Sequence, residues 1–60
     1  MEHIYSFCVL PPVPGGMWGL AQSLGTSYNE AKTNLLKTIA NGSEVKDPVN
    51  GQCPPNFGGG

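Results

Sequence analysis

Apolar and polar residues between Ser27 and Ala40 repeat with the period of an α-helix. Ser27 and Glu30 have the spacing of a capping box, in which each side chain pairs with a backbone N–H that the first helical turn leaves free. Asn41-Gly42 then supplies a pair that can end a helix in the left-handed conformation. The pattern predicts one amphipathic helix, and the residues of its apolar stripe are Tyr28, Ala31, Leu35, Leu36, Ile39 and Ala40.

The segment from His3 to Leu10, HIYSFCVL, is short and rich in β-branched and aromatic residues, and Pro11-Pro12 ends it. These features predict a β-strand. Both faces of this strand would be mainly apolar. We therefore expect it to be covered on two sides or to lie in an oligomer interface.

Residues 11–16, PPVPGG, predict a turn or a short projecting loop. Residues 17–24, MWGLAQSL, fit either a strand or a helix. A strand antiparallel to the first is favoured, because Gly19 and Gly25 disfavour a continuous helix. Gly25-Thr26 would then form the tight turn into the main helix.

After Gly42 the composition changes to a Gly- and Pro-rich segment with few large apolar residues. Two regions are expected: a small α+β module over 1–42, and a tail over 43–60 that is mobile or is ordered only by a neighbour. Within the tail, Ser43 to Val49 can supply one short strand, which Pro48 confines to an edge. The predicted class is α+β, with a small antiparallel sheet of two to three strands packed on one amphipathic helix and a flexible C-terminal tail.

The chain has 60 residues, and a domain of this size buries only roughly 60% of the surface that its unfolded chain exposes. With a loose tail, about forty residues would have to build the core, a length at which disulfides, metals or oligomerisation are usually needed. A homo-oligomer is therefore expected.

The charged residues are few, with Lys+Arg 3 against Asp+Glu 4, and arginine is absent. A chain without a basic stripe is not expected to bind nucleic acid directly, and the lack of arginine disfavours a phosphoryl-transfer site. No apolar run approaches the ~20 residues of a membrane span, and no secretion signal is recognised. These features predict a cytoplasmic protein with reduced cysteines.

Few residues offer chemistry. His3 has no Cys, Asp or Glu at a metal-ligand spacing, so no metal is expected. Cys8 in an apolar strand is interpreted as an inert small hydrophobe, and Cys53 as the more exposed and more oxidisable thiol. No base and nucleophile pair is present, which predicts a protein without catalytic activity or cofactor. The helix start offers a possible anion site at Gly25, Thr26 and Ser27, although Ser27 is already accounted for as a cap.

An association surface is the sharper prediction. Trp18 beside the flexible Met17 is typical of a contact surface as well as of a core. His3, Tyr5 and Phe7 share one face of the first strand. The predicted partner or oligomer interface consists of His3, Tyr5, Phe7, Met17 and Trp18.

Two short motifs carry a family resemblance. The segments PPVPG (11–15) and GTSYNEA (25–31), with Asn34-Leu35-Leu36 and Ile39 in the helix, resemble the HicB-like antitoxin family. Its members carry a strand, a P-x-[aliphatic]-P-G turn, a second strand and G-D-T-x-x-E-A leading into an amphipathic helix. Thr26 stands where the family has Asp, and the family's first strand has no counterpart before His3. The resemblance implies an α+β fold that binds a protein partner, often a small ribonuclease toxin.

The leading hypothesis is a non-enzymatic binding protein that oligomerises and occludes or sequesters a partner. One alternative is a small-molecule sequestering protein of phage origin, which would bind an anionic or nucleotide ligand in a pocket between subunits, formed by residues 11–16 and the helix start. Another is a structural subunit of a larger assembly, in which the tail becomes ordered.

Overall fold

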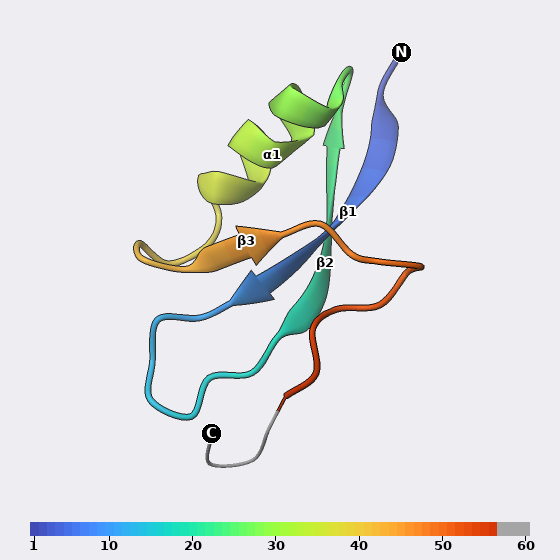
Figure 1. Cartoon of the computed structure of the whole chain (residues 1–60). Helices are drawn as coiled ribbons and strands as arrows, with labels where there is room; N and C mark the ends of the chain where they lie inside the picture. Colours follow the sequence, from blue (N-terminus) through green and yellow to red (C-terminus); the bar gives the residue numbers. More distant parts are fainter. Residues whose placement is uncertain (57–60) are drawn as a thin grey trace.

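The computed structural model describes residues 1–56 and has the element order β1 (His3–Leu10), β2 (Gly19–Gly25), α1 (Tyr28–Leu36) and β3 (Glu44–Lys46). The strands form one antiparallel sheet in the order β2-β1-β3, with α1 lying on one face (Figure 1). The predicted α+β class is confirmed. The last four residues of the predicted tail, 57–60, lie outside the described residues.

Both long strands form where the sequence predicts them. β1 has the expected bounds, and residues 17–24 resolve as strand, which begins at Gly19. Between the strands, Gly16 N–H donates to Val13 O (3.0 Å) and Gly15 has φ 75°. This is the turn that Pro-Gly favours, because glycine accepts the positive φ at the third turn position.

The helix begins where the capping box predicts and ends earlier. Ser27 Oγ accepts from the Glu30 N–H (3.2 Å). The carboxylate of Glu30, however, accepts from Thr26 Oγ1 (2.6 Å). At the other end, the N–H and the hydroxyl of Thr38 both donate to Leu35 O (2.9 and 2.8 Å), which tightens the last turn and ends the helix at Leu36.

The core lies between α1 and the sheet. Its buried members are Phe7 of β1 and Ala31 and Leu35 of α1. Partly buried residues surround them, namely Tyr5, Val9, Ala21, Ile39 and Val45. The tyrosine at the helix start, Tyr28, closes one end, with its ring centroid 5.4 Å from that of Phe7.

Gly25 allows the helix to approach the sheet closely. A Cβ placed on it would lie 2.5 Å from the Ala31 nitrogen. Backbone atoms cannot yield to such a contact, so β2 has to end in glycine for the helix to start at this height above the sheet.

The segment after Gly42 is tied to the sheet. β3 pairs with β1 at the edge opposite β2 and is followed by Pro48, as the edge-strand prediction required. Val49 and Gln52 then form a tight hairpin through reciprocal backbone hydrogen bonds (2.8 and 2.9 Å), with positive φ at Asn50 and Gly51. Asn-Gly is the preferred pair for such a turn.

Cys8 and Cys53 form a disulfide across 45 residues. The prediction of two free thiols, with Cys8 inert and Cys53 exposed, is therefore wrong. The physical reason is that residues 47–53 fold back over the sheet and place Cys53 next to Cys8, which a sequence separation cannot reveal.

Candidate functional site

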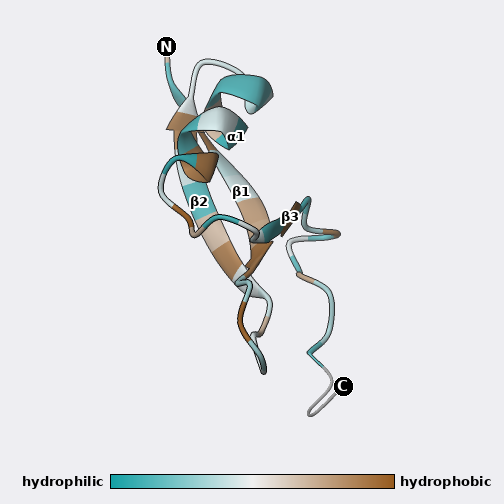
Figure 2. Ribbon diagram, turned by 90° about the vertical axis from the view of Figure 1, so that its left-hand side faces the viewer, coloured by the Kyte–Doolittle hydropathy of each residue, from teal (hydrophilic) through white to brown (hydrophobic). Residues whose placement is uncertain are grey.

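The two faces of the sheet are covered differently. Side chains alternate between faces along each strand, and Tyr5, Phe7 and Ala21 point toward α1. Figure 2 shows the helix on one side of the sheet and hydrophobic bands along both long strands. We call the opposite side the outer face; it is formed by Ile4, Ser6, Cys8 and Leu10 of β1 and by Leu20, Gln22 and Leu24 of β2.

Three aliphatic residues of the outer face remain exposed, and we call them the open patch. They are Ile4 (65% exposed), Leu20 (56%) and Leu24 (50%). Ile4 lies directly opposite Leu24 in the register, whereas Gln22 separates Leu24 from Leu20 along β2. Isolated exposed leucines are ordinary on a protein surface, but three on one sheet face form the kind of surface that binds a partner.

The C-terminal segment covers the part of the outer face around Cys8. Cys53 covers the buried Cys8 through the disulfide. The side chain of Asn56 accepts from the Trp18 N–H (2.6 Å) and donates to the Trp18 carbonyl (3.3 Å). Lys46 places its ammonium 5.3 Å from the centroid of the Trp18 ring. These contacts hold Trp18 against the molecule.

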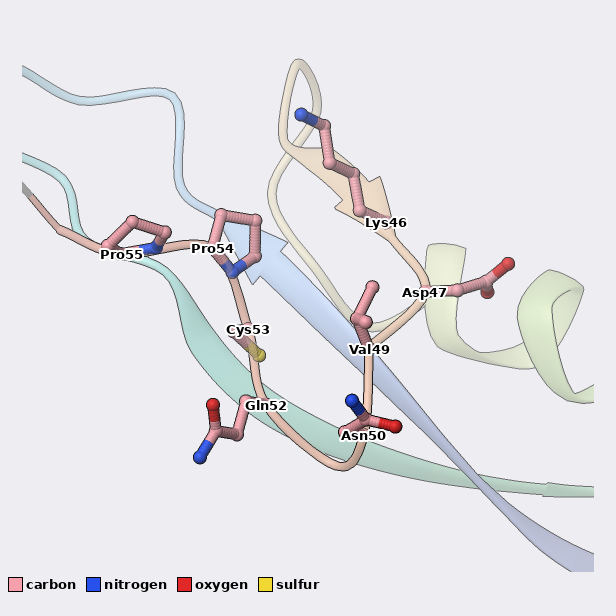
Figure 3. A pocket seen from close by; sticks show the side chains of 8 residues that line it. All are labelled: Lys46, Asp47, Val49, Asn50, Gln52, Cys53, Pro54 and Pro55. Atoms are coloured by element: carbon pink, nitrogen blue, oxygen red, sulfur yellow. The ribbon is translucent and has the colours of Figure 1, made fainter.

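A cavity of about 400 Å³ opens beside the disulfide, and Figure 3 shows the side chains around it. Its lining residues are Lys46, Asp47, Val49, Asn50, Gln52, Cys53, Pro54 and Pro55. The volume falls in the range of ligand pockets. Its two charged groups are already engaged, because Lys46 contacts Trp18 and Asp47 accepts from the Tyr28 hydroxyl (2.5 Å).

The hydrogen bond from Tyr28 raises the pKa of its phenol above the ordinary value of 10.0. The Asp47 carboxylate accepts from the neutral phenol, and desolvation and the negative charge act in the same direction. A phenol with a raised pKa is a weaker acid, so this group is not suited to donate a proton in a reaction. The hydrogen bond between Tyr28 and Asp47 instead connects α1 to the C-terminal segment.

The five residues predicted as an interface do not form one surface. Phe7 is 0% exposed in the core, so its assignment to the association surface of the folded chain is wrong. Tyr5 packs beside Phe7, and the exposed His3 stacks edge-to-face on Tyr5 with centroids 6.5 Å apart. Exposed Met17 and half-buried Trp18 lie at the opposite end of the sheet. Alternation along β1 directs Tyr5 and Phe7 to the helix.

The predicted anion site is occupied by the helix start itself. Gly25 is buried beneath Ala31, Ser27 Oγ caps Glu30, and the hydroxyl of Thr26 is bound to the Glu30 carboxylate. An anion at this position would meet that carboxylate. Residues 11–16 also lie at the opposite end of the sheet from Gly25, because β1 and β2 pair from His3 with Gly25 to Val9 with Gly19 (Figure 1).

The strongest candidate site is therefore the open patch, which the predicted site residues do not include. Its signal was present in the alternation, since a strand over 17–24 places Leu20, Gln22 and Leu24 on one side. Among residues 1–56, no three His, Cys, Asp or Glu side chains gather to hold a metal ion. Over the same residues, no helix has the length and apolar character needed to cross a membrane.

Comparison with known proteins gives no relative: no family model, no curated protein and no solved structure matches the chain. The similarity to HicB-like antitoxins stays a prediction.

Proposed function

We propose that this chain is a non-enzymatic binding protein that self-associates through the outer face of its sheet. The open patch carries this proposal. Each of its three side chains keeps at least half of its surface exposed, while the other sheet face is covered by α1. Burying the remaining surface of each residue would contribute about 1 kcal/mol to association.

The small core supports self-association. Its fully or nearly fully buried apolar residues are Phe7, Cys8, Ala31 and Leu35. The chain measures 42 × 26 × 11 Å along its principal axes, so it is thin in one direction. Contact of the open patch with a second copy would add to the apolar area that the isolated chain buries.

A protein partner is the further element of the proposal. The HicB-like resemblance implies a small ribonuclease toxin, which the antitoxin-like protein would bind and occlude. Two observations support a toxin as the partner: the sequence resemblance itself, and the α+β arrangement, which the resemblance implies. Inhibition of a ribonuclease toxin of this kind by the purified protein is the expected result, and unaltered RNA cleavage at a molar excess would exclude it.

The disulfide bears on where the protein works. Disulfides persist in oxidising compartments and are rare in the reducing cytosol. The predicted cytoplasmic location would require the bond between Cys8 and Cys53 to survive there. We therefore favour an oxidising environment. Thiol labelling of the protein isolated under acid quench would distinguish a bonded from a reduced pair.

The patch is tested by two matched leucines. Leu24 and Leu36 are both 50% exposed, but only Leu24 lies in the open patch, whereas Leu36 ends α1. We expect Leu24→Lys to weaken self-association by at least roughly tenfold, since both copies of a symmetric interface lose the contact. Leu36→Lys should leave it unchanged. Sedimentation velocity over a dilution series measures both, and equal behaviour of the two variants would contradict the proposal.

A further inference from the structure

Strand β2 is an edge of the sheet without the usual protection. Among residues 1–56 it pairs only with β1, and it runs from Gly19 to Gly25 without a charged residue or proline. The opposite edge, β3, is three residues long, carries Glu44 and Lys46, and is followed by Pro48. Short length, charge and proline are the features that keep sheet edges from pairing with other chains. Of the two edges, β2 is the one left open, apart from Leu24 O, which the Asn34 amide would yield to a second strand.

The contacts at both ends of β2 show which backbone groups point away from β1. Asn34 donates to Leu24 O (3.0 Å), and Asn56 binds both the N–H and the carbonyl of Trp18. Backbone groups alternate in direction along an antiparallel strand, so the even-numbered residues point outward. The N–H and carbonyl of Leu20 and Gln22 are then directed at the open edge.

The sequence of β2 is nearly symmetric about its centre. It reads GLAQSLG, with Gln22 in the middle. Antiparallel pairing of two copies around Gln22 places Gly19 opposite Gly25, Leu20 opposite Leu24, and Ala21 opposite Ser23. Identical residue types would meet at every position except the Ala21–Ser23 pairs, where two small residues meet. A pattern of this kind fits a two-fold interface, in which the same strand serves both copies.

We propose that two copies of the chain pair β2 to β2 around a two-fold axis at Gln22, forming one continuous antiparallel sheet from the three strands of each copy. This inference rests on the self-association proposed above and places the contact at the edge of the sheet, so that the outer faces of the two copies lie side by side. The occupant of the edge is a second copy, because the symmetric pattern matches this strand to itself.

The pairing also unites the open patch. Within one chain, Gln22 separates Leu24 from Leu20. In the pair, Leu20 of the second copy lies beside Leu24, and Ile4 continues the row on the other side. The two rows that contain Ile4, Leu24 and the second copy's Leu20 are apolar. Between these rows the two Gln22 side chains face one another, and their amides can exchange hydrogen bonds.

The register is tested by Gln22→Cys. Residues directly opposite in a hydrogen-bonded antiparallel pair have Cα atoms about 5.5 Å apart, which is a suitable separation for a disulfide. Glutathione disulfide serves as oxidant: the two thiols lose two protons and two electrons, and the oxidant is reduced to two glutathione molecules. We expect a covalent dimer from Gln22→Cys and none from Asn29→Cys, which lies on the exposed side of α1. Peptide mapping verifies that Cys8 remains bonded to Cys53.

Two further variants test the register between the β2 strands of the two copies. Leu20→Cys and Leu24→Cys chains should each fail to cross-link alone and should cross-link when mixed, because the register pairs position 20 with position 24. Wild-type light scattering runs in parallel. A dimer in which neither Gln22→Cys nor the mixture cross-links would overturn the β2 pairing while leaving self-association in place. A monomer at every concentration would overturn the proposed function and this inference together.

Discussion

The two faces of the sheet are built from the same strands and from similar residues, yet they have different roles. On the covered face, Phe7 is enclosed by α1. On the outer face, Ile4 and Leu24 remain exposed, and the buried Cys8 is covered by a disulfide rather than by a packed helix. The difference teaches that alternation in a strand can assign one set of side chains to folding and the neighbouring set to association.

The largest expected effect comes from the covered face. Phe7→Ala removes a fully buried ring and should lower the free energy of unfolding by about 3–5 kcal/mol, enough to unfold a domain of this size. Leu20→Ala on the outer face should cost much less in a dilute monomer, since Leu20 is already mostly exposed. Urea denaturation, monitored by circular dichroism, gives the free energy of unfolding of the Phe7→Ala and Leu20→Ala variants. Similar losses would mean that the outer face is also part of the core.

The disulfide ranks second. Replacing both Cys8 and Cys53 by alanine removes a link across 45 residues and should cost about 2–4 kcal/mol, chiefly by enlarging the unfolded ensemble. The same change should release Asn56 from Trp18 and move the tryptophan fluorescence toward that of an exposed indole. Unchanged fluorescence together with unchanged stability would show that the C-terminal segment is held without the bond.

The smallest effect concerns the contact between Tyr28 and Asp47. The raised pKa means that the folded state favours the neutral phenol, so its contribution to stability is complete below pH 10.0 and is lost as the pH rises through the folded pKa. Asp47→Asn should lower the pKa of Tyr28 toward its ordinary value. Titration of phenolate absorbance in the wild type and in the Asp47→Asn variant measures the pKa of Tyr28 in each. Identical curves would remove Asp47 as the cause.

Local pattern was sufficient for most of the fold. β1 could be predicted with its bounds because Pro11 ends it, and the helix start because Ser27 is a good cap. The helix end was missed because Thr38 binds Leu35 instead of continuing the helix. The hairpin at Asn50-Gly51 had a readable signal, since this pair favours the turn.

The surroundings of the candidate site were harder to predict because they depend on contacts between residues distant in sequence. The disulfide and the hydrogen bonds of Asn56 to Trp18 join residues 45 and 38 positions apart, and neither follows from spacing. The prediction placed Phe7 at the interface because aromatic residues are common in both cores and contact surfaces. Once β2 is known to be an edge, the symmetry of its sequence becomes informative.

The most direct test of the account introduces a charge at the centre of β2. Gln22→Lys and Gln22→Glu each place like charges opposite one another in the proposed pair, so each variant alone should dimerise roughly fivefold more weakly than the wild type. An equimolar mixture brings opposite charges together and should recover the dimer. Light scattering across a dilution series measures all four samples. Recovery only in the mixture is the predicted result, whereas variants that associate like the wild type, alone and mixed, would contradict a two-fold axis at Gln22.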